Sequence, residues 1–548
     1  MTYVKHVEVL PKEDRLLKIL VYTLDIPCMS RTVSSGLSSR MVLTILLLIL
    51  LVFLALAFYI RRVTKWEKPP PGPAIHPFLG NFPTMAKLDP VPHKAWHSLT
   101  LQFGPMVRLV MGLNNMLVIG GYEDMKEAMN NELLDDRGPS PTANLVLFGS
   151  ETVDEISLFA RGKLPKDAKL NPVEKWREIR RFILRSLRDL GAGKSGSEEA
   201  IIEESKALIK NITEAVDGTN GEINLEKTLN CAALNIVWNL VAGERFSYDD
   251  PLMRQLVDFS GNFMLMGKDV IGKPFGFMPF LRFIPPFKEK FNKLSSSLIK
   301  FKEYINSEID KHKESFDKEN QRDLMDMFIA KMDEDTHGIF TQTQLIYICL
   351  DLFNAGSEST SKSLLFAIAL MMRYPEIQDK VHDDLDKIDA DCVTMKDRTK
   401  IPYVEATLNE IWRFCNVAPF GPPRQAYKDT PLKSTIIPAG TLVMYNTYSL
   451  HMDEAHWGDP EVFRPERFLD DYGAFRSDEM NLPFGIGRRK CLGESLARME
   501  NFLFLSNIFQ NFKFVQIGDS PPSLEPEVGF TNGPYPFTTK IVIRNRNN

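Results

Sequence analysis

Apolar residues recur along most of this chain at the spacing expected of helices, every three or four positions. The clearest such stretches are Glu199 to Ala215, Phe287 to Glu314, Gln342 to Met372 and Glu376 to Leu385. Shorter runs predict strands near Met106 to Met111, Met116 to Ile119, Leu442 to Asn446 and Thr538 to Ile543. The pattern predicts a mainly α protein with minor β-sheets. No internal repeat or low-complexity linker divides residues 74–548, so we expect one large domain there.

One apolar run near the amino terminus has a different character. Residues 42–60 are continuously apolar except for Thr44, and nineteen residues of helix just cross the hydrocarbon of a bilayer. Four basic residues follow within 61–68, whereas only Arg31 and Arg40 lie close on the other side. The bias of positive charge predicts that the carboxy-terminal bulk lies in the cytosol.

These features predict the organisation of the first 73 residues. We expect an extension of unknown role at 1–40, a transmembrane anchor at 41–60, and a basic stop-transfer segment with a proline-rich hinge at 61–73. A cleaved signal peptide is the alternative. It is disfavoured because the A-x-A match at Ala55–Ala57 lies inside the apolar run rather than after it.

Composition excludes several classes of protein. The net charge of −5 and the lack of a basic tract argue against nucleic-acid binding. The six cysteines show neither C-x-x-C nor Cys/His ligand spacing, which argues against a zinc site. Scattered free thiols suit a largely cytosolic body.

The segment Phe484–Gly493 reads F-x-x-G-x-R-x-C-x-G and carries the strongest chemical signal. Cys491 stands where a loop becomes a helix, and free N–H groups and the helix dipole there favour the thiolate, a metal ligand. Gly487 and Gly493 leave the backbone open to a flat ligand, and Arg489 offers a positive charge to a ligand carboxylate. The alternative is a buried structural cysteine beside a basic turn.

A second signal interrupts the apolar helix Gln342 to Met372. Gly356 and an acid, Glu358, are unfavourable inside such a helix, and a broken local rule often marks function. Gly356 is expected to open a groove for a small molecule, and the Ser359 hydroxyl to bond the carbonyl of Ala355. A kinked helix with a solvated polar patch is the alternative.

The Phe484–Gly493 segment resembles the haem-binding loop of the cytochrome P-450 superfamily, the haem-thiolate monooxygenases. The resemblance covers nearly everything from Trp66 onward and implies the fold of that family and bound haem b (iron protoporphyrin IX). It implies that Cys491 is the axial iron ligand and that Phe484, Arg489 and Gly493 contribute to haem binding.

Ala355–Thr360 resembles the family's oxygen-activation motif, A/G-G-x-D/E-T-T/S. The resemblance implies that Glu358 and Ser359 relay protons and that Thr360 shares the role. Ser359 stands where threonine is usual, which puts coupling efficiency rather than activity in question.

Other matches imply contacts away from the reacting centre. Trp176 and Arg180 form W-x-x-x-R and would bond a haem propionate, although by themselves they read as an amphipathic surface helix. Arg424 stands where relatives place another propionate donor. The pair Glu410/Arg413 and Arg467, in a P-E-R-F segment, would form a buried structural network.

The resemblance is to microsomal members of family-two type, as found in arthropods. It implies insertion of one oxygen atom from O2 into a lipophilic substrate by hydroxylation or epoxidation, such as a steroid or terpenoid hormone or a xenobiotic. It also implies a single-pass location in the endoplasmic reticulum membrane with a cytosolic catalytic domain. By the same resemblance, the substrate-facing segments include 144–172, 256–287, 417–422 and 530–532.

The source of electrons must be external, because the chain lacks a flavin or dinucleotide fingerprint. An NADPH-dependent flavoprotein reductase is the expected partner. The basic face Arg177, Arg181, Arg185 and Arg188 is either its docking patch or a solvated surface. A haem-thiolate isomerase or dehydratase acting on peroxides, and a non-catalytic haem-binding protein, stay open as alternatives.

Overall fold

A computed structural model describes residues 41, 43–53, 66–76, 79–112, 114–137, 155–157, 171–265, 267–270, 276 and 278–545. They fall into two units, Met1–Lys65 and Trp66–Asn548. In the first unit, residues 43–53 are helical. No helix within the described residues has the length and apolar character needed to span a bilayer. The extension 1–40 and much of the predicted anchor and of the segment 144–172 lie outside the described residues.

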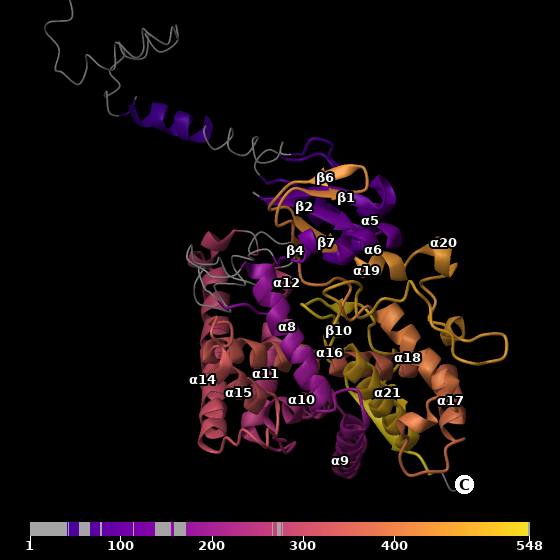
Figure 1. Cartoon of the computed structure of the whole chain (residues 1–548). Coiled ribbons are helices and arrows are strands. Elements are labelled where there is room, and N and C mark those ends of the chain that lie inside the picture. The colour runs from indigo at the N-terminus through magenta and orange to yellow at the C-terminus, as the bar shows by residue number, and fades with distance from the viewer. Residues whose placement is uncertain are drawn as a thin grey trace, which may run out of the picture. The chain divides into compact units, whose positions relative to one another are not determined.

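The second unit is built mainly of helices (Figure 1). The longer ones are α5 (Pro92–Phe103), α8 (Pro172–Asp189), α9 (Ser195–Thr219), α10 (Glu226–Ala242), α11 (Pro251–Leu265), α14 (Phe287–Glu314), α15 (Leu324–Glu334), α16 (Gln342–Arg373), α17 (Pro375–Leu385), α18 (Pro402–Cys415) and α21 (Glu494–Asn511). Shorter helices are α4 (Phe82–Leu88), α6 (Tyr122–Asn130), α12 (Gly267–Val270), α19 (Thr447–His451), α20 (Glu454–Trp457) and the 3-10 turns η1 (Glu132–Leu134), η2 (Pro279–Phe283), η3 (Met395–Asp397) and η4 (Pro465–Phe468).

The described residues form four small sheets beside the helices. The largest has the order β1-β2-β7-β4, formed by Met106–Met111, Asn114–Ile119, Leu442–Tyr445 and Arg424–Gln425. A second has the order β3-β11-β8, formed by Glu222–Ile223, Thr539–Ile543 and Phe512–Val515. Two hairpins are β5-β6 (Thr430–Leu432 and Thr435–Ile437) and β10-β9 (Gly533–Pro534 and Pro526–Glu527).

Two helices, α16 and α21, lie in the centre of the fold. The residues Ser363 to Met372 of α16 and Met499 to Gln510 of α21 are all buried. A helix buried all round has no polar stripe, which explains why Ser363 to Met372 reads as almost uniformly apolar. The α21 segment instead buries five polar side chains: Glu500, Asn501, Ser506, Asn507 and Gln510. The Thr341 side chain caps α16 by accepting from the N–H of Gln344.

The predicted secondary structure is confirmed with small shifts at the ends. α14 spans the predicted residues, α16 is longer by Arg373, and α9 extends beyond the predicted stretch at both ends. The helix predicted after Cys491 begins at Glu494. The prediction of a mainly α fold with minor sheets is therefore correct.

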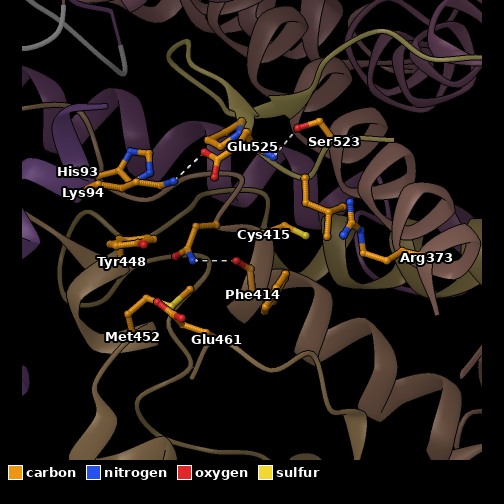
Figure 2. A pocket seen from close by; sticks show the side chains of 13 residues that line it. His93, Lys94, Arg373, Phe414, Cys415, Tyr448, Met452, Glu461, Ser523 and Glu525 are labelled. Atoms are coloured by element: carbon orange, nitrogen blue, oxygen red, sulfur yellow. Dashed lines mark hydrogen bonds and ion pairs between the residues drawn. The ribbon is translucent and has the colours of Figure 1, made fainter. Parts of the chain in front are cut away.

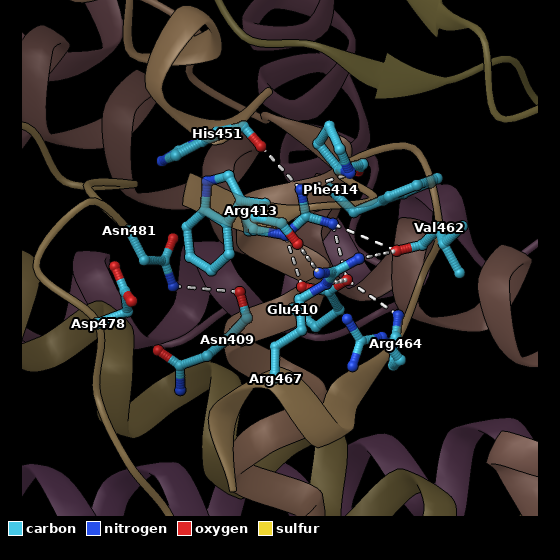
Figure 3. A network of polar contacts seen from close by, with 12 residues as sticks. Asn409, Glu410, Arg413, Phe414, His451, Val462, Arg464, Arg467, Asp478 and Asn481 are labelled. Carbon is cyan, nitrogen blue, oxygen red and sulfur yellow. Dashed lines mark hydrogen bonds and ion pairs between the residues drawn. The ribbon is translucent and has the colours of Figure 1, made fainter. Parts of the chain in front are cut away.

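The predicted network around Glu410 is present and buried (Figure 3). Arg413 donates from Nε and Nη2 to the two oxygens of Glu410 at 2.6 and 2.7 Å. Arg467 Nε lies 3.3 Å from the same carboxylate. Arg413 also donates to the carbonyl of His451, whose own ring accepts from the N–H of Leu482. The network thereby reaches a residue two positions before Phe484, at the start of the cysteine loop.

Candidate functional site

The cysteine loop is closed by its own backbone. The N–H of Cys491 donates to the carbonyl of Phe484 at 2.9 Å, and Gly493 is the N-cap of α21. Gly487 has φ 79°, and a Cβ on it would lie 2.3 Å from the carbonyl oxygen of Met129. This glycine is therefore required by the turn itself. At Gly493 a Cβ would meet nothing within 4 Å, so this side of the loop is open, as a flat ligand requires.

The sulfur of Cys491 borders this open side, and its residue is exposed. Burial among surrounding protein atoms raises the pKa of its thiol, while the N–H of Gly493 lowers it. The N–H group at the helix start thus acts in the predicted direction, toward the thiolate, and burial opposes it. A bound cation would supply the missing stabilisation.

Four arginines gather beside the loop. Arg180 on α8 donates to the carbonyl of Lys490 at 2.7 Å, and Arg424 on β4 donates to the carbonyl of Met129 at 3.0 Å. Arg137 donates to the carbonyl of Pro422, and Arg489 to that of Asp135. The chain thus brings together side chains from four separate segments of the sequence.

These arginines carry more positive charge than nearby acids neutralise. Burial, followed by repulsion from Arg137 and Arg424, holds the pKa of Arg489 well below its usual range. Burial also lowers the pKa of Arg137 to about 10. Buried nitrogens on Arg137, Arg424 and Arg489 have no hydrogen-bond acceptor among the described residues. Unmatched buried donors of one sign require an anion, and the two propionates of haem would meet that need.

Trp176 lies inside this cluster rather than on a surface face. The guanidinium of Arg489 covers its ring at 3.7 Å from the centroid, and that of Arg180 lies 5.8 Å from it. The helix α8 is amphipathic, as its sequence indicates, and Trp176 lies on its buried face, whereas Arg181, Arg185 and Arg188 are exposed. Arg137 was not singled out from the sequence, since a lone arginine in a loop gives no local signal.

On α16, the Ser359 hydroxyl donates to the carbonyl of Ala355 at 2.7 Å, as predicted. Glu358 is buried, and its Oε1 accepts from the amide of Asn230 at 3.3 Å. Its Oε2 has no hydrogen-bond partner in the described part of the chain. Burial raises the pKa of this carboxyl, which favours the protonated acid.

Thr360 faces a different helix from Glu358. Its hydroxyl lies 2.9 Å from Oε2 of Glu500 on α21. Glu500 was not predicted as a site residue, because an acid nine positions after Cys491 matches no motif used above. The structure therefore brings two buried acids to this segment of α16, Glu358 on the helix itself and Glu500 on α21.

The predicted role of Gly356 is wrong. A Cβ at this position would lie 2.3 Å from Cγ2 of Val237 on α10. Glycine is needed there for close contact between α10 and α16, and it does not open a groove for a small molecule.

A separate pocket of about 370 Å³ lies between α5, the ends of α16 and α18, α19 and the turn Ser523–Pro526 (Figure 2). The Lys94–Glu525 ion pair crosses its wall at 2.7 Å. None of the predicted site residues lines it. It is therefore distinct from the cysteine loop and its arginines.

Comparison with known proteins agrees with this geometry. A family model described as cytochrome P450 matches residues 70–541. The chain is 32% identical to cytochrome P450 2C44 of Mus musculus, over 91% of this chain and 99% of the relative. It is 31% identical to cytochrome P450 2E1 of Mus musculus, over 92% of this chain and 99% of that relative. It is 34% identical to cytochrome P450 2C3 of Oryctolagus cuniculus, over 85% and 92%. The chain therefore belongs to the cytochrome P450 family, the haem-thiolate monooxygenases that bind haem b through a cysteine.

Proposed function

We propose that this enzyme inserts one oxygen atom from O2 into a lipophilic substrate, by hydroxylation or epoxidation, with Cys491 as the axial ligand of its haem. Haem supplies the iron at which dioxygen is activated by two external electrons. When haem is bound, Arg137, Arg180, Arg424 and Arg489 would hold its propionates. Glu358 would give up protons to the reaction, and Ser359 and Thr360 would assist it.

The observation that carries this proposal is the buried arginine cluster. Three of its guanidinium groups keep a buried nitrogen without an acceptor among the described residues, and Arg180 of the same cluster bonds the loop carbonyl of Lys490. The loop itself is open at Gly493, where a Cβ would meet no atom within 4 Å. A flat group with two carboxylates satisfies both features.

The substrate class is inferred from the helices around Glu358. The ring of Phe259 stacks on that of Phe301 with 4.8 Å between the ring centroids, and the centroids of Phe301 and Phe353 of α16 are 4.7 Å apart. Phe263 lies 5.7 Å from Phe530, whose N–H donates to the carbonyl of Met264. Aromatic side chains gathered near the helix of Glu358 support a lipophilic substrate such as a steroid, a terpenoid or a xenobiotic.

The electron donor and location follow from the same reading. We infer that an NADPH-dependent flavoprotein reductase docks at α8, where Arg185 and Arg188 are exposed. We also infer an anchor at 41–60 in the endoplasmic reticulum membrane, a hinge at 61–73 and a cytosolic catalytic domain at 74–548.

The absorption band of the reduced carbon monoxide complex tests the proposal. Wild type should show the red-shifted band of a thiolate ligand, and Cys491→Ser should lose it. Cys392→Ser, at another partly exposed cysteine, should keep it. A band that survives Cys491→Ser would refute the ligand assignment.

Turnover with the reductase tests the reaction class. NADPH oxidation coupled to dioxygen uptake and an oxygenated lipophilic product is expected. Rearrangement of a lipid peroxide without NADPH would identify the isomerase or dehydratase alternative instead.

A further inference from the structure

Four polar side chains form a small ladder between α10 and α16. Glu226 and Asn230 are one turn apart on α10, and Glu358 and Lys362 are one turn apart on α16. Lys362 Nζ donates to Glu226 Oε1 at 2.6 Å, and Asn230 Nδ2 donates to Glu358 Oε1 at 3.3 Å. The ion pair therefore stands next to the buried acid on the same two helices.

The ladder leads from the buried acid toward solvent. Glu358 is 1% exposed as a residue, whereas the side chains of Lys362 and Glu226 are 10% and 29% exposed. The stem of Lys362 lies over Gly533, where a Cβ would come within 2.4 Å of its Cδ. The glycine makes room for the lysine to lie between the acid and the surface.

The orientation of Asn230 is fixed by a second contact. Ser361 Oγ donates to Asn230 Oδ1 at 2.8 Å, so the amide nitrogen faces Glu358. On α11, Gly261 lies against the acid, since a Cβ there would be 3.6 Å from Glu358 Oε1. The charged groups acting on Glu358 are thus Lys362, which stabilises its anion, and Glu226, which opposes it.

We propose that Glu226 and Lys362 form the solvent end of the route by which Glu358 regains each proton it gives up, with Asn230 positioning the acid. The lysine can reach either carboxylate because it lies one turn from Glu358 and contacts Glu226. The Lys362 ammonium gives a proton to the Glu358 carboxylate and becomes a neutral amine. The Glu226 carboxylate takes a proton from solvent hydronium and passes it to that amine, which restores the ammonium–carboxylate pair.

This inference rests on the proposed function, and a merely structural ion pair is its rival. The two roles differ in what happens to Glu358. Removing Lys362 takes away a cation that favours ionised Glu358, whereas removing Glu226 takes away an anion that opposes it. If the Lys362–Glu226 pair were only structural, removing either residue would destabilise the packing of α10 and α16 in the same way.

The test uses the resting ferric enzyme with Lys362→Met, Glu226→Gln and the control Lys227→Met. Lys227 is the residue after Glu226 and pairs with Asp258 of α11 at 2.8 Å, but it is not among the charges that act on Glu358. The infrared carbonyl band of protonated Glu358 is assigned by its loss in Glu358→Gln and is then titrated with pH. This readout requires no turnover.

We expect the Glu358 midpoint to rise by about one pH unit in Lys362→Met and to fall in Glu226→Gln, with no change in Lys227→Met. With reductase, the first two variants should release about two- to tenfold more hydrogen peroxide per NADPH than wild type, because proton supply is part of acid catalysis. Unchanged midpoints, or shifts in the same direction, would overturn the proposal. If Lys362→Met does not fold, Glu226→Gln alone decides.

Failure of this inference is distinguishable from failure of the proposed function. The thiolate-type carbon monoxide band should be retained in wild type and in all three variants. If that band is present and the midpoint of the Glu358 titration is the same in wild type and variants, only the proton route is wrong. If wild type itself lacks the band, the haem-thiolate assignment is wrong, whatever the titrations show.

Discussion

The hydroxyl of Thr360 on α16 lies 2.9 Å from Oε2 of Glu500 on α21. Both residues are buried, and the other oxygen of Glu500 has no hydrogen-bond partner among the described residues. Burial raises the pKa of Glu500 to about 8, which the bond from Thr360 only partly offsets. A neutral carboxylic acid therefore joins the helix of the acid–alcohol pair to the helix that follows Cys491.

This pair predicts a pH-dependent contribution to stability. Glu500 titrates near 4.5 when exposed and at about 8 when buried, so between these values the folded protein holds a proton that the unfolded chain has lost. Stability should then fall as pH rises through this window, by up to about 1.4 kcal/mol per pH unit. Below the window the contribution is constant. Urea unfolding of wild type and Glu500→Gln at pH 5 to 9 measures it.

The glutamine variant should lack this component, because its amide does not titrate. Thr360→Val is the matched control: it removes the only hydrogen bond to the acid that the structure describes, so it should raise the pKa of folded Glu500 and extend the fall in stability to higher pH. Equal pH dependence in wild type and Glu500→Gln would show that Glu500 is ionised in the folded protein.

Most of the fold could be predicted because periodicity is a local property. α14 and β1 occupy the predicted residues, and α16 differs by one residue. The start of α21 could not be placed from periodicity, since the apolar pattern already begins at Leu492 while the backbone turns until Gly493. Turn geometry decides that boundary.

The site was predictable only where its residues lie in one short segment. Cys491, Arg489 and Glu358 belong to such segments, and the Ser359–Ala355 bond is set by helix geometry alone. Arg137 and Glu500 act through contacts with residues far away in the sequence, and such pairings leave no local pattern. Gly356 was misread because the helix that approaches it, α10, cannot be identified from α16.

Arg137 provides a test of the arginine cluster. Arg137→Gln removes one buried cation, and a lost charge-assisted hydrogen bond costs about 1.5–3 kcal/mol. Haem should therefore leave the protein roughly 10- to 100-fold faster, as measured by transfer to an excess of a haem-acceptor protein. Arg185→Gln, on the exposed face of α8, should leave this rate unchanged.

Gly356 provides a test of the contact between α10 and α16. Gly356→Ala places a methyl group against Val237, and overpacking of this kind typically costs about 1–3 kcal/mol. The double variant with Val237→Ala should recover much of this loss, since the clashing methyl groups are removed. Unfolding free energies of the two single variants and the double variant give the coupling. Additive losses would contradict the contact.

The network of Glu410 predicts a strong asymmetry between its arginines. Arg413 and Glu410 are fully buried, whereas Arg464 donates only its backbone N–H to this carboxylate and its side chain is exposed. Arg413→Met should cost about 3–5 kcal/mol, because it leaves a buried carboxylate without its main partner. Arg464→Met should cost less than about 1 kcal/mol, as expected for an exposed ion pair. The double variant Glu410→Gln with Arg413→Met should be more stable than Arg413→Met alone, since the unpaired charge is gone. A loss in the double variant equal to the sum of the single losses would show that the two side chains act independently.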